Sequence, residues 1–592
     1  MKSRTRRKGR SRPLTPPAPV APAPVAPATA PDQPEGAAHG SEAPGAARGS
    51  NGPVVPAAVF ADEASFGRFF VPAALLLLLA AAALRLPDLA LNPFHHDEGV
   101  NGFFTTNLMR QGHYAYNPAN FHGPTLYYFA LLSGIVFGLT TEAMRLVPVA
   151  FGLLTVALVL PLRRSIGPLA ALTAAGLLAV SPGTVYISRY FIHEALLVCF
   201  SLAIFVAGLR YLETSRRGYL LVVAAAAALL FATKETGIIT IGVWAIAIVM
   251  TRLYVDWRTP RRRWRTADER RPRAARPARS VWIEGVEYRA APQAGGPTGG
   301  QPGGQAGLLG RLSLDREHAL AAAIVFLVIY ILFYSSFFTN YPQGLIDSLA
   351  TFTIWTQTSS ATQSQPIGSY VAWMLSADAP IVLLGAVGGL LAARRGRDRL
   401  SVFIGLWALG VTLAYSLIPY KTPWIVLNML VPLALLAGLA VRELWTVVRW
   451  RRALPLLLAG AGVVSAYQAV DLNFRRYDDE AYPYVFVHTT RQMLDLLAEI
   501  DRTAARAGTG ADTGIVFVTP ETWPLPWYMR NHPNAVFHGR VVPTEEPMIV
   551  AHVNQRAELE PTIEGRYTEV GVYTLRPGVD LVLYVRNDLR AG

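Results

Sequence analysis

Long apolar runs, separated by short polar segments, dominate the chain. A membrane-spanning helix needs about 20 consecutive apolar residues, and many of the runs approach that length. The pattern therefore predicts a polytopic membrane protein. The predicted spans are residues 69–87, 143–163, 167–187, 190–212, 218–233, 236–254, 318–338, 378–394, 400–418, 423–441 and 453–470.

One further apolar run, 124–140, is ambiguous, and the arginines decide how to interpret it. Cytoplasmic loops of membrane proteins are enriched in Lys and Arg. If the basic N-terminus is cytoplasmic and 124–140 does not cross, every cluster falls on the cytoplasmic side. These clusters are Arg163–Arg164, Arg216–Arg217, residues 258–279, Arg394–Arg397 and Arg449–Arg452. We therefore expect an interfacial or re-entrant helix at 124–140, about 11 spans, and an extracytoplasmic C-terminus.

Composition changes divide the chain further. Residues 1–64 are basic and then Pro/Ala-rich, and 256–316 hold an Arg cluster and a Gly/Pro/Gln tract. Such segments bury too little apolar surface to fold, so we predict a disordered cytoplasmic tail and a disordered cytoplasmic loop. From residue 476 the apolar runs shorten to strand length around one helical stretch, which indicates a small α/β domain over 476–592. The transmembrane halves are then 65–255, with the candidate catalytic first outer loop, and 317–475.

The predicted fold class is thus an all-α polytopic protein of the cell membrane, with outer-face interfacial helices and a small C-terminal α/β domain. Only 16% of residues are charged, against roughly 25% in globular domains. The net charge of +14 resides in arginine clusters between apolar runs, which favours topology signals and excludes nucleic acid as a partner. Cys199 is the single cysteine, so no intramolecular disulfide forms.

Two acidic segments fall at the predicted outer ends of spans. His95-His96-Asp97-Glu98 follows the first span, and Glu194 opens a later one. Ionisable groups at membrane depth are costly and mark candidate sites. Asp97 and Glu194 form a plausible pair around one acceptor, with one acting as a general base. Two structural alternatives stay open: Asp97 as a helix cap, and an ion pair of Glu194 with Arg189.

Lysine usage is a second, independent signal. The chain has four lysines among 54 basic residues, and two lie in the N-terminal tail. The other two, Lys234 and Lys421, fall in short predicted outer loops, against the positive-inside tendency. A compact ammonium group facing a lipid phosphate is one reason for this placement. Snorkelling at a helix end is the structural alternative.

Several motifs recur together: the acid pair Asp97-Glu98 after the first span, Gly123–Tyr128, Arg145–Pro148 and Ser181–Glu194. They resemble the GT-C glycosyltransferases, above all protein O-mannosyltransferases and the aminoarabinose transferases of lipid A. More narrowly, His95–Gly99, His122–Pro124, Thr233–Glu235, Pro419–Trp424 and Trp523–Tyr528 look like a family labelled flippase activity-associated. The resemblance spans about 69–540 without the Arg-rich insertion, and it implies a polyprenyl-phosphate sugar donor, an outer-face reaction and inversion at the anomeric carbon.

The resemblance also implies roles for individual residues. Asp97 matches the first-loop catalytic acid, with Glu98 beside it, and Glu194 falls at the second acid, where mannosyltransferases tend to have Asp. Lys421 is the expected ligand of the lipid phosphate, with Arg189 and Lys234 as further candidates. The remaining predicted substrate-binding residues are His95, His96, His122, Tyr127, Glu235 and Tyr420. No cofactor is required, although the doubled histidine leaves room for a divalent metal ion at His96 and Asp97.

The sequence therefore favours a membrane glycosyltransferase. It would move a sugar from a polyprenyl-phosphate donor to a protein, lipid-linked glycan or envelope acceptor. The alternative is a non-catalytic partner in the flipping or handling of lipid-linked oligosaccharides. A solute transporter is disfavoured, because its polar residues would lie near the middle of the bilayer, whereas here they gather at one face.

Overall fold

A computed structural model describes residues 57–120, 122–258, 280–283, 286–289, 315–357, 364–396 and 398–589. Nearly all of the predicted N-terminal tail and most of the predicted cytoplasmic loop lie outside these residues. Within the loop, the short strands β1 (Ser280–Ile283) and β2 (Val286–Arg289) pair antiparallel. The first helix begins at Ala57, before the predicted end of the tail.

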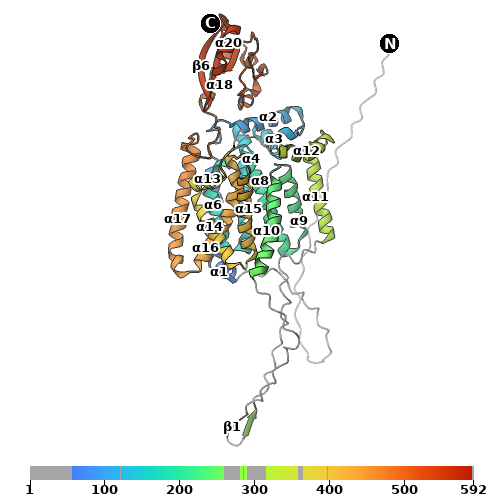
Figure 1. Cartoon of the computed structure of the whole chain (residues 1–592), viewed down its shortest axis with the longest axis vertical. Helices are drawn as coiled ribbons and strands as arrows, with labels where there is room; N and C mark the ends of the chain where they lie inside the picture. The colour runs from blue at the N-terminus through green and yellow to red at the C-terminus, as the bar shows by residue number, and fades with distance from the viewer. Residues whose placement is uncertain are drawn as a thin grey trace, which may run out of the picture. The chain divides into compact units, whose positions relative to one another are not determined.

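Helices make up the membrane part of the chain (Figure 1). The N-terminal half contains α1 (Ala57–Arg85), α2 (His96–Gln111), α3 (Thr125–Phe137), α4 (Thr141–Val159), α5 (Arg163–Ile166), α6 (Pro168–Val180), α7 (Pro182–Ser188), α8 (Glu194–Thr214), α9 (Arg217–Phe231) and α10 (Gly237–Arg258). The C-terminal half contains α11 (Arg316–Tyr334), α12 (Gln343–Gln357), α13 (Ser369–Ala377), α14 (Ala379–Arg395), α15 (Arg399–Leu417), α16 (Leu427–Trp445) and α17 (Val448–Val470).

Among the described residues, eight helices are long and apolar enough to cross a membrane, or ten if each of two bent pairs is one span. The polytopic membrane architecture is thereby confirmed, whereas the count of eleven is not. The predicted span 218–233 is the one without a counterpart among them; it corresponds to α9, which has 15 residues and is about 22 Å long. The ambiguous run forms α3, whose 13 residues reach about 20 Å, short of the roughly 30 Å hydrocarbon core.

Small residues allow the central helix α16 to pack closely. A Cβ atom on Gly388 of α14 would lie 2.0 Å from the Leu436 carbonyl oxygen, and one on Gly438 would lie 2.2 Å from the Ala170 carbonyl oxygen of α6. Close approach of backbones at small residues is typical of helices in membranes, where dispersion contacts replace the hydrophobic effect. These contacts make α16 the centre of the bundle, and 83% of its spanning window is buried.

Two bends meet on one buried carboxylate. The axis turns by 60° between α6 and α7 and by 116° between α13 and α14. Asp378 lies at the second bend, where it accepts hydrogen bonds from Ser181 Oγ at 2.5 Å and from Tyr484 Oη at 2.7 Å. This network fixes both bends to each other and to the segment after α17.

The C-terminal region forms a five-stranded sheet in the order β4-β3-β5-β7-β6. Its strands are β3 (Ile515–Phe517), β4 (Ala535–Phe537), β5 (Met548–His552), β6 (Tyr567–Arg576) and β7 (Val579–Arg586). Strand β3 is parallel to β4 and β5, and β7 is antiparallel to β5 and β6. Helices α18 (Gln492–Arg506), α19 (Leu525–Tyr528) and α20 (Arg556–Ile563) complete it, and α18 buries Met493, Leu496 and Ile500. The predicted α/β character is confirmed.

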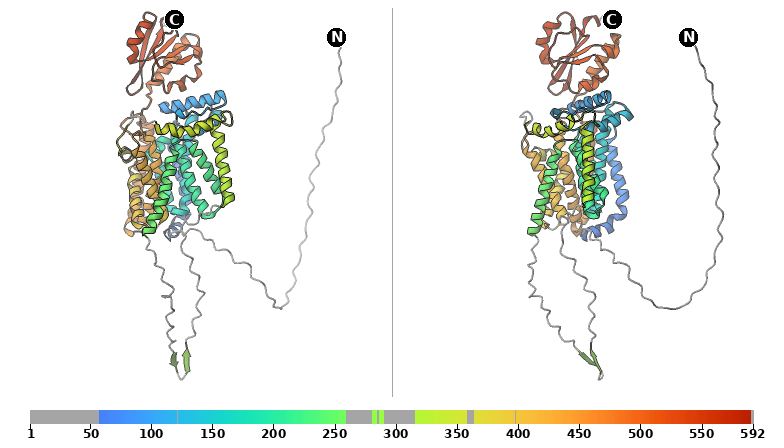
Figure 2. Two further views of the ribbon diagram at one scale, coloured as in Figure 1. Left: turned by 45° about the vertical axis from the view of Figure 1, so that its right-hand side comes forward. Right: turned by 90° about the vertical axis from the view of Figure 1, so that its right-hand side faces the viewer.

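The elements that carry the candidate residues gather at one end of the bundle. Helices α2 and α12 lie across the ends of the spanning helices in all three views (Figures 1 and 2). The loops before α8, between α9 and α10 and before α16 open at the same end. Residues far apart in the chain therefore meet there.

Candidate active site

A histidine, not an aspartate, caps the first helix of the site. His95 Nδ1 accepts a hydrogen bond from the Asp97 amide at 3.1 Å, and the Glu98 carboxylate accepts one from the His95 amide at 2.8 Å. This is a reciprocal capping box at the start of α2. His95 Nε2 also lies 2.8 Å from the Phe486 carbonyl oxygen. Both ring nitrogens are engaged, so His95 positions the start of α2, and its predicted substrate contact stays a prediction.

Glu98 is fully buried and saturated. Arg145 binds it through Nε at 2.7 Å and Nη2 at 2.6 Å. The amides of His95 and Phe191 donate to the same carboxylate at 2.8 Å and 2.7 Å. A carboxylate with four donors has no free lone pair directed at a substrate. The structure therefore shows Glu98 balancing the charge of a buried guanidinium, and its predicted catalytic role stays untested.

Asp97, one residue earlier, has the opposite environment. Successive helical residues point about 100° apart, so when Glu98 faces the core Asp97 faces outward, and it is partly exposed. Among the described residues its carboxylate makes no ion pair or hydrogen bond to a side chain. Burial, followed by the charges of Asp97 and Glu194, raises the pKa of the Tyr420 phenol. Both carboxylates consequently lie within electrostatic reach of Tyr420.

Glu194 and Lys234 form a buried ion pair between α8 and the α9–α10 loop. Glu194 is 2% exposed. The predicted alternative, a pair with Arg189, is wrong, since Arg189 donates to the carbonyl oxygens of Arg85, Pro87 and Asp88 at 2.7–3.1 Å. Arg189 thus secures the loop after α1 through three of its five N–H groups, and its predicted phosphate contact stays a prediction. Lys234 is likewise occupied by Glu194.

Two of the predicted motifs dock on each other. His122 and Lys234 form an antiparallel bridge, and the Gly123 amide donates to the Thr233 carbonyl at 3.1 Å. A Cβ atom on Gly123 would lie 2.1 Å from the Ala232 carbonyl oxygen, so only glycine fits. This contact brings His122 Nδ1 to 3.9 Å from Glu235 Oε2.

A polar cluster lies around that contact. The Tyr116 hydroxyl donates to Glu235 Oε1 at 3.1 Å, and the Thr351 hydroxyl of α12 lies 2.8 Å from the Tyr116 oxygen, to which it donates. The rings of His122 and His193 lie 4.7 Å apart. Burial, together with the charges of His122 and Lys234, lowers the pKa of His193 well below its usual value, so His193 is neutral at pH 7.

Lys421 is a buried cation without a carboxylate partner in the described part of the chain. It is 2% exposed, and its Nζ donates to the Ile418 carbonyl at 2.6 Å. An ammonium group has three donors, so this bond leaves capacity for an anion. Burial also lowers the pKa of Lys421. Its neighbour Tyr420 is 41% exposed and stays a candidate for substrate contact.

Two predicted substrate residues differ in their surroundings. Tyr127 is 1% exposed, and its hydroxyl donates to Asn101 Oδ1 at 3.2 Å. It lies in the core behind α2, and its predicted substrate contact stays a prediction. His96 is only half-buried and lies 3.4 Å, through Nδ1, from Arg576 Nη1. Burial, with smaller effects of His95 and Arg576, lowers the pKa of His96 to about 4 against the opposing effect of Asp97.

No group of three or more His, Cys, Asp or Glu side chains arranged to hold a metal ion occurs in the described ranges. At the position predicted for a metal, His96 Nδ1 faces a guanidinium and His95 is engaged by the backbone. The residues present therefore do not fit a divalent ion bound by His96 and Asp97. No step of the chemistry below is assigned to a metal.

The C-terminal domain covers the outward side of α2. The Trp527 ring stacks on Phe94 with centroids 4.9 Å apart, and the Tyr528 hydroxyl accepts a hydrogen bond from the Phe94 amide at 2.9 Å. Cβ atoms on Gly99 and Gly102 would lie 2.5 Å from Pro524 and 2.6 Å from Trp527. The two glycines are needed because the domain approaches the helix backbone.

Several residues that build the site were not singled out by sequence reasoning for these roles. They are Arg145, His193, Tyr116 and Arg576. A signal existed for Arg145, since an arginine in an apolar helix needs a buried acceptor. Tyr116, His193 and Arg576 depend on contacts between distant segments, which no local pattern reveals.

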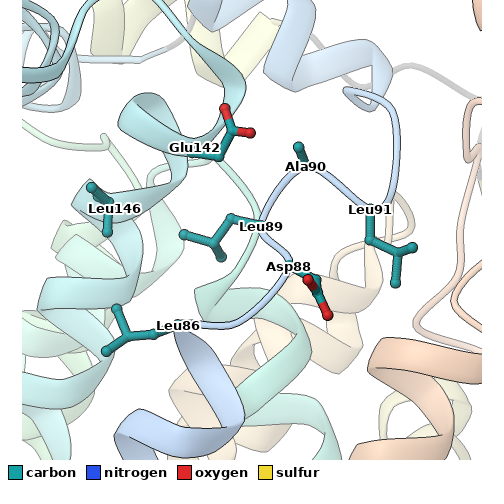
Figure 3. Close-up of a pocket in the computed structure, with 7 residues that line it drawn as sticks. All are labelled: Leu86, Asp88, Leu89, Ala90, Leu91, Glu142 and Leu146. Carbon is teal, nitrogen blue, oxygen red and sulfur yellow. The ribbon is translucent and has the colours of Figure 1, made fainter.

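A cavity of about 480 Å³ lies next to the loop after α1 (Figure 3). It is lined by the end of α1, the following loop and the start of α4, including Asp88, Leu89 and Glu142. None of the predicted site residues lines it. Asp88 is exposed, so its substitution is a suitable control for substitutions of Asp97.

Comparisons with known proteins identify the fold. The family model described as dolichyl-phosphate-mannose-protein mannosyltransferase matches residues 121–265, about a quarter of the chain. The crystal structure of ArnT from Cupriavidus metallidurans bound to undecaprenyl phosphate covers 89% of this chain and 99% of its own, with 16% identity and a TM-score of 0.57. The protein has the GT-C fold. The apo structure of the same ArnT matches with a TM-score of 0.56, again at 16% identity over 89% of this chain and 99% of that one.

The GT-C fold confirms the resemblance inferred from the motifs. The narrower likeness to the flippase activity-associated family stays a prediction. The apo oligosaccharyltransferase of Archaeoglobus fulgidus also matches, at 13% identity over 84% of this chain and 73% of that one, with a TM-score of 0.47. A search of curated proteins finds no match.

Proposed function

We propose that the protein is a membrane glycosyltransferase that moves a sugar from a polyprenyl-phosphate carrier to an acceptor at the outer face of the membrane. The GT-C fold supports the class of reaction, and the ArnT structure that shares it holds a polyprenyl phosphate. One observation carries the assignment of residues. Of the predicted acids and cations, Asp97 and Lys421 alone make neither an ion pair nor, as Arg189 does, three hydrogen bonds to backbone carbonyls within the described chain.

The pairing pattern assigns opposite tasks to these two groups. Asp97, partly exposed and without a partner, accepts the proton of the acceptor nucleophile. The nucleophile attacks the anomeric carbon with inversion, and the bond from that carbon to the phosphate oxygen breaks. The electron pair leaves with the lipid phosphate, whose growing negative charge Lys421 stabilises. A fixed cation in a water-poor site is most effective at such a position.

The neighbouring residues hold this geometry. Lys234 neutralises the carboxylate of Glu194, which lies near Tyr420. Glu194 therefore acts as a positioning residue on the side of the site formed by α8 and the α9–α10 loop. His96, His122 and Tyr420 are exposed enough to contact the sugar or the acceptor. Because His96 and His193 are neutral at pH 7, Lys421 is the cation that the lipid phosphate meets.

The test uses the purified full chain and a panel of radiolabelled polyprenyl-phosphate sugars. We expect consumption of at least one donor by the parent protein. The Asp97→Asn variant should lose about 10²- to 10⁴-fold in turnover, the usual contribution of a general base. Lys421→Gln should lose about 10²- to 10³-fold, as for removal of one transition-state donor. Asp88→Asn, an exposed acid of the same loop, should retain full activity.

The same variants separate the transferase from the alternative role as a partner in lipid-linked oligosaccharide handling. A non-catalytic partner would keep its glycosylation phenotype in cells with Asp97→Asn, provided that the variant folds. Retention of turnover by Asp97→Asn would refute the assignment of the base. Loss of turnover by Asp88→Asn to the same extent would also refute it.

A further inference from the structure

A second charged cavity lies at the other end of the bundle. It has a volume of about 620 Å³, and its charged lining consists of Arg258, Arg394, Arg395, Arg442, Asp398 and Glu443. The 22 residues of α10 separate Arg258 from the loop that holds Lys234. At 1.5 Å per residue this is about 33 Å, enough to cross a hydrocarbon core of roughly 30 Å. The cavity thus belongs to the opposite membrane interface and is independent of the proposed catalytic site.

Four helices supply the walls. Helices α10, α14, α15 and α16 lie together in the bundle (Figure 1), and each brings a charged residue of the cavity to the same end. Arg442 closes the inner wall, where Nη1 donates to the Ile166 carbonyl at 3.0 Å and Nη2 to Glu443 at 2.9 Å. Arg258 Nη2 donates to the Arg394 carbonyl at 2.5 Å. These bonds also satisfy helix C-terminal carbonyls, whose dipoles favour cations.

The charges in the cavity do not balance. Glu443 is shared by Arg395 and Arg442. The Asp398 carboxylate accepts from the Leu400 amide at 3.1 Å and from Ser401 as the N-cap of α15. Arg258 and Arg394 make no ion pair with any carboxylate of the described residues. Four guanidinium groups therefore face two carboxylates that are already engaged.

Arg442 adds a sign that an acceptor is missing. It is 5% exposed, and its Nε has no hydrogen-bond partner within the described chain. Buried donors are nearly always satisfied. A topology signal requires only that arginines lie on one side of the membrane. It does not require them to line a common cavity or one guanidinium to be buried with a donor unused.

We propose that this cavity binds a phosphate group, and that its position at the membrane interface makes the headgroup of an anionic phospholipid the natural source. Guanidinium groups match phosphate oxygens in geometry and charge. Basic pockets between transmembrane helices on the cytoplasmic side bind acidic headgroups in other membrane proteins. The bound lipid would join α10, α14 and α16 at the end remote from the chemistry.

The test measures lipid retention by native mass spectrometry of the delipidated full chain. The probes are dioleoyl-phosphatidylglycerol, zwitterionic dioleoyl-phosphatidylcholine and inorganic phosphate. The variant Arg258→Gln/Arg394→Gln removes two cations that have no carboxylate partner, so it leaves no carboxylate without its ion-pair partner. Each basic residue near an anionic headgroup contributes about fivefold in affinity. We expect the double variant to weaken phosphatidylglycerol binding roughly 25-fold. Arg452→Gln, an exposed arginine of α17, should bind like the parent.

The outcomes distinguish the source of the phosphate. Selective retention of phosphatidylglycerol, weakened in the double variant, supports a lipid headgroup. Competition by millimolar inorganic phosphate without lipid selectivity supports a soluble phosphate in the same cavity. The proposal is overturned if the double variant binds phosphatidylglycerol and inorganic phosphate like the parent. It is also overturned if Arg452→Gln weakens binding as much as the double variant does. Turnover of the sugar donor is measured separately, so failure here leaves the proposed reaction untouched.

Discussion

The contrast between Glu98 and Asp97 allows a sharp test, because the two acids are adjacent yet differ in every contact. Replacing Glu98 by Gln keeps the shape but removes the charge that balances Arg145, at 3% exposure, and turns one acceptor oxygen into a donor. That new NH₂ group would face the His95 amide or Arg145 Nη2, both of which now donate to the carboxylate.

The magnitude follows from the buried pair. Removing one partner of a buried ion pair costs about 3–5 kcal/mol, because the remaining charge is uncompensated. Since about 1.4 kcal/mol is a factor of ten, the unfolding equilibrium should shift by about two to three and a half decades. Asp97→Asn should change stability by less than about 0.5 kcal/mol, as expected for a partly exposed side chain without partners.

The assay is reversible unfolding in mixed dodecyl sulfate and dodecyl maltoside micelles, followed by tryptophan fluorescence. The double variant Glu98→Gln/Arg145→Met should recover part of the lost stability, since the orphaned guanidinium is gone. The reasoning fails if Glu98→Gln unfolds at the same dodecyl sulfate fraction as the parent, whether turnover is kept or lost. Two results are then possible: unchanged stability with normal turnover, and unchanged stability with lost turnover. The second result would return Glu98 to the catalytic residues.

Three further predictions concern packing, pH and topology. Gly102→Val should loosen the C-terminal domain by about 1–3 kcal/mol, because a Cβ atom lies 2.6 Å from Trp527. Limited proteolysis should then cleave the linker near residue 480 faster, while Gly208→Ala, whose Cβ meets open space, should not change the rate. The pKa of His96 is about 4, below the unfolded 6.5, so the unfolded chain binds the proton more tightly. Stability should fall by up to about 3 kcal/mol as the pH drops from about 6.5 to 4; a His96→Gln variant with an unchanged slope would contradict this. A reporter fused after the C-terminus should be extracytoplasmic and one inserted within 265–305 cytoplasmic, and the opposite pattern would reverse the predicted orientation.

The architecture could be predicted from the sequence because a helix that crosses a membrane needs a long run of apolar residues. The neighbourhood of the site could also be predicted, since loops at the same ends of spans must lie near one another. The convergence of Asp97, Glu194 and Tyr420 at one end of the bundle agrees with that expectation. The domain boundaries, the catalytic roles and the orientation stay predictions.

The individual contacts were beyond the sequence. Which of two adjacent acids faces the core depends on the rotation of α2, and that rotation is fixed by Arg145, 47 residues away. Similarly, the sequence allows Arg189 to pair with Glu194. In the structure Arg189 instead donates hydrogen bonds to three carbonyl oxygens at the end of α1 and in the following loop. The sequence pattern identifies the charged groups near the site, but tertiary packing determines which of them are neutralised by a partner.

The cover over α2 has a consequence for biosynthesis. Phe94 and Tyr528 are hydrogen-bonded across 434 positions of the chain. A ribosome therefore releases the loop that carries Asp97 long before it produces the residues that enclose it. Until the C-terminal residues have been synthesised and folded, the apolar side of this loop stays uncovered and open to chaperones or proteases. Premature termination within the final hundred codons should accordingly yield inserted but inactive protein, so the enclosure acts as a check on completion of the chain.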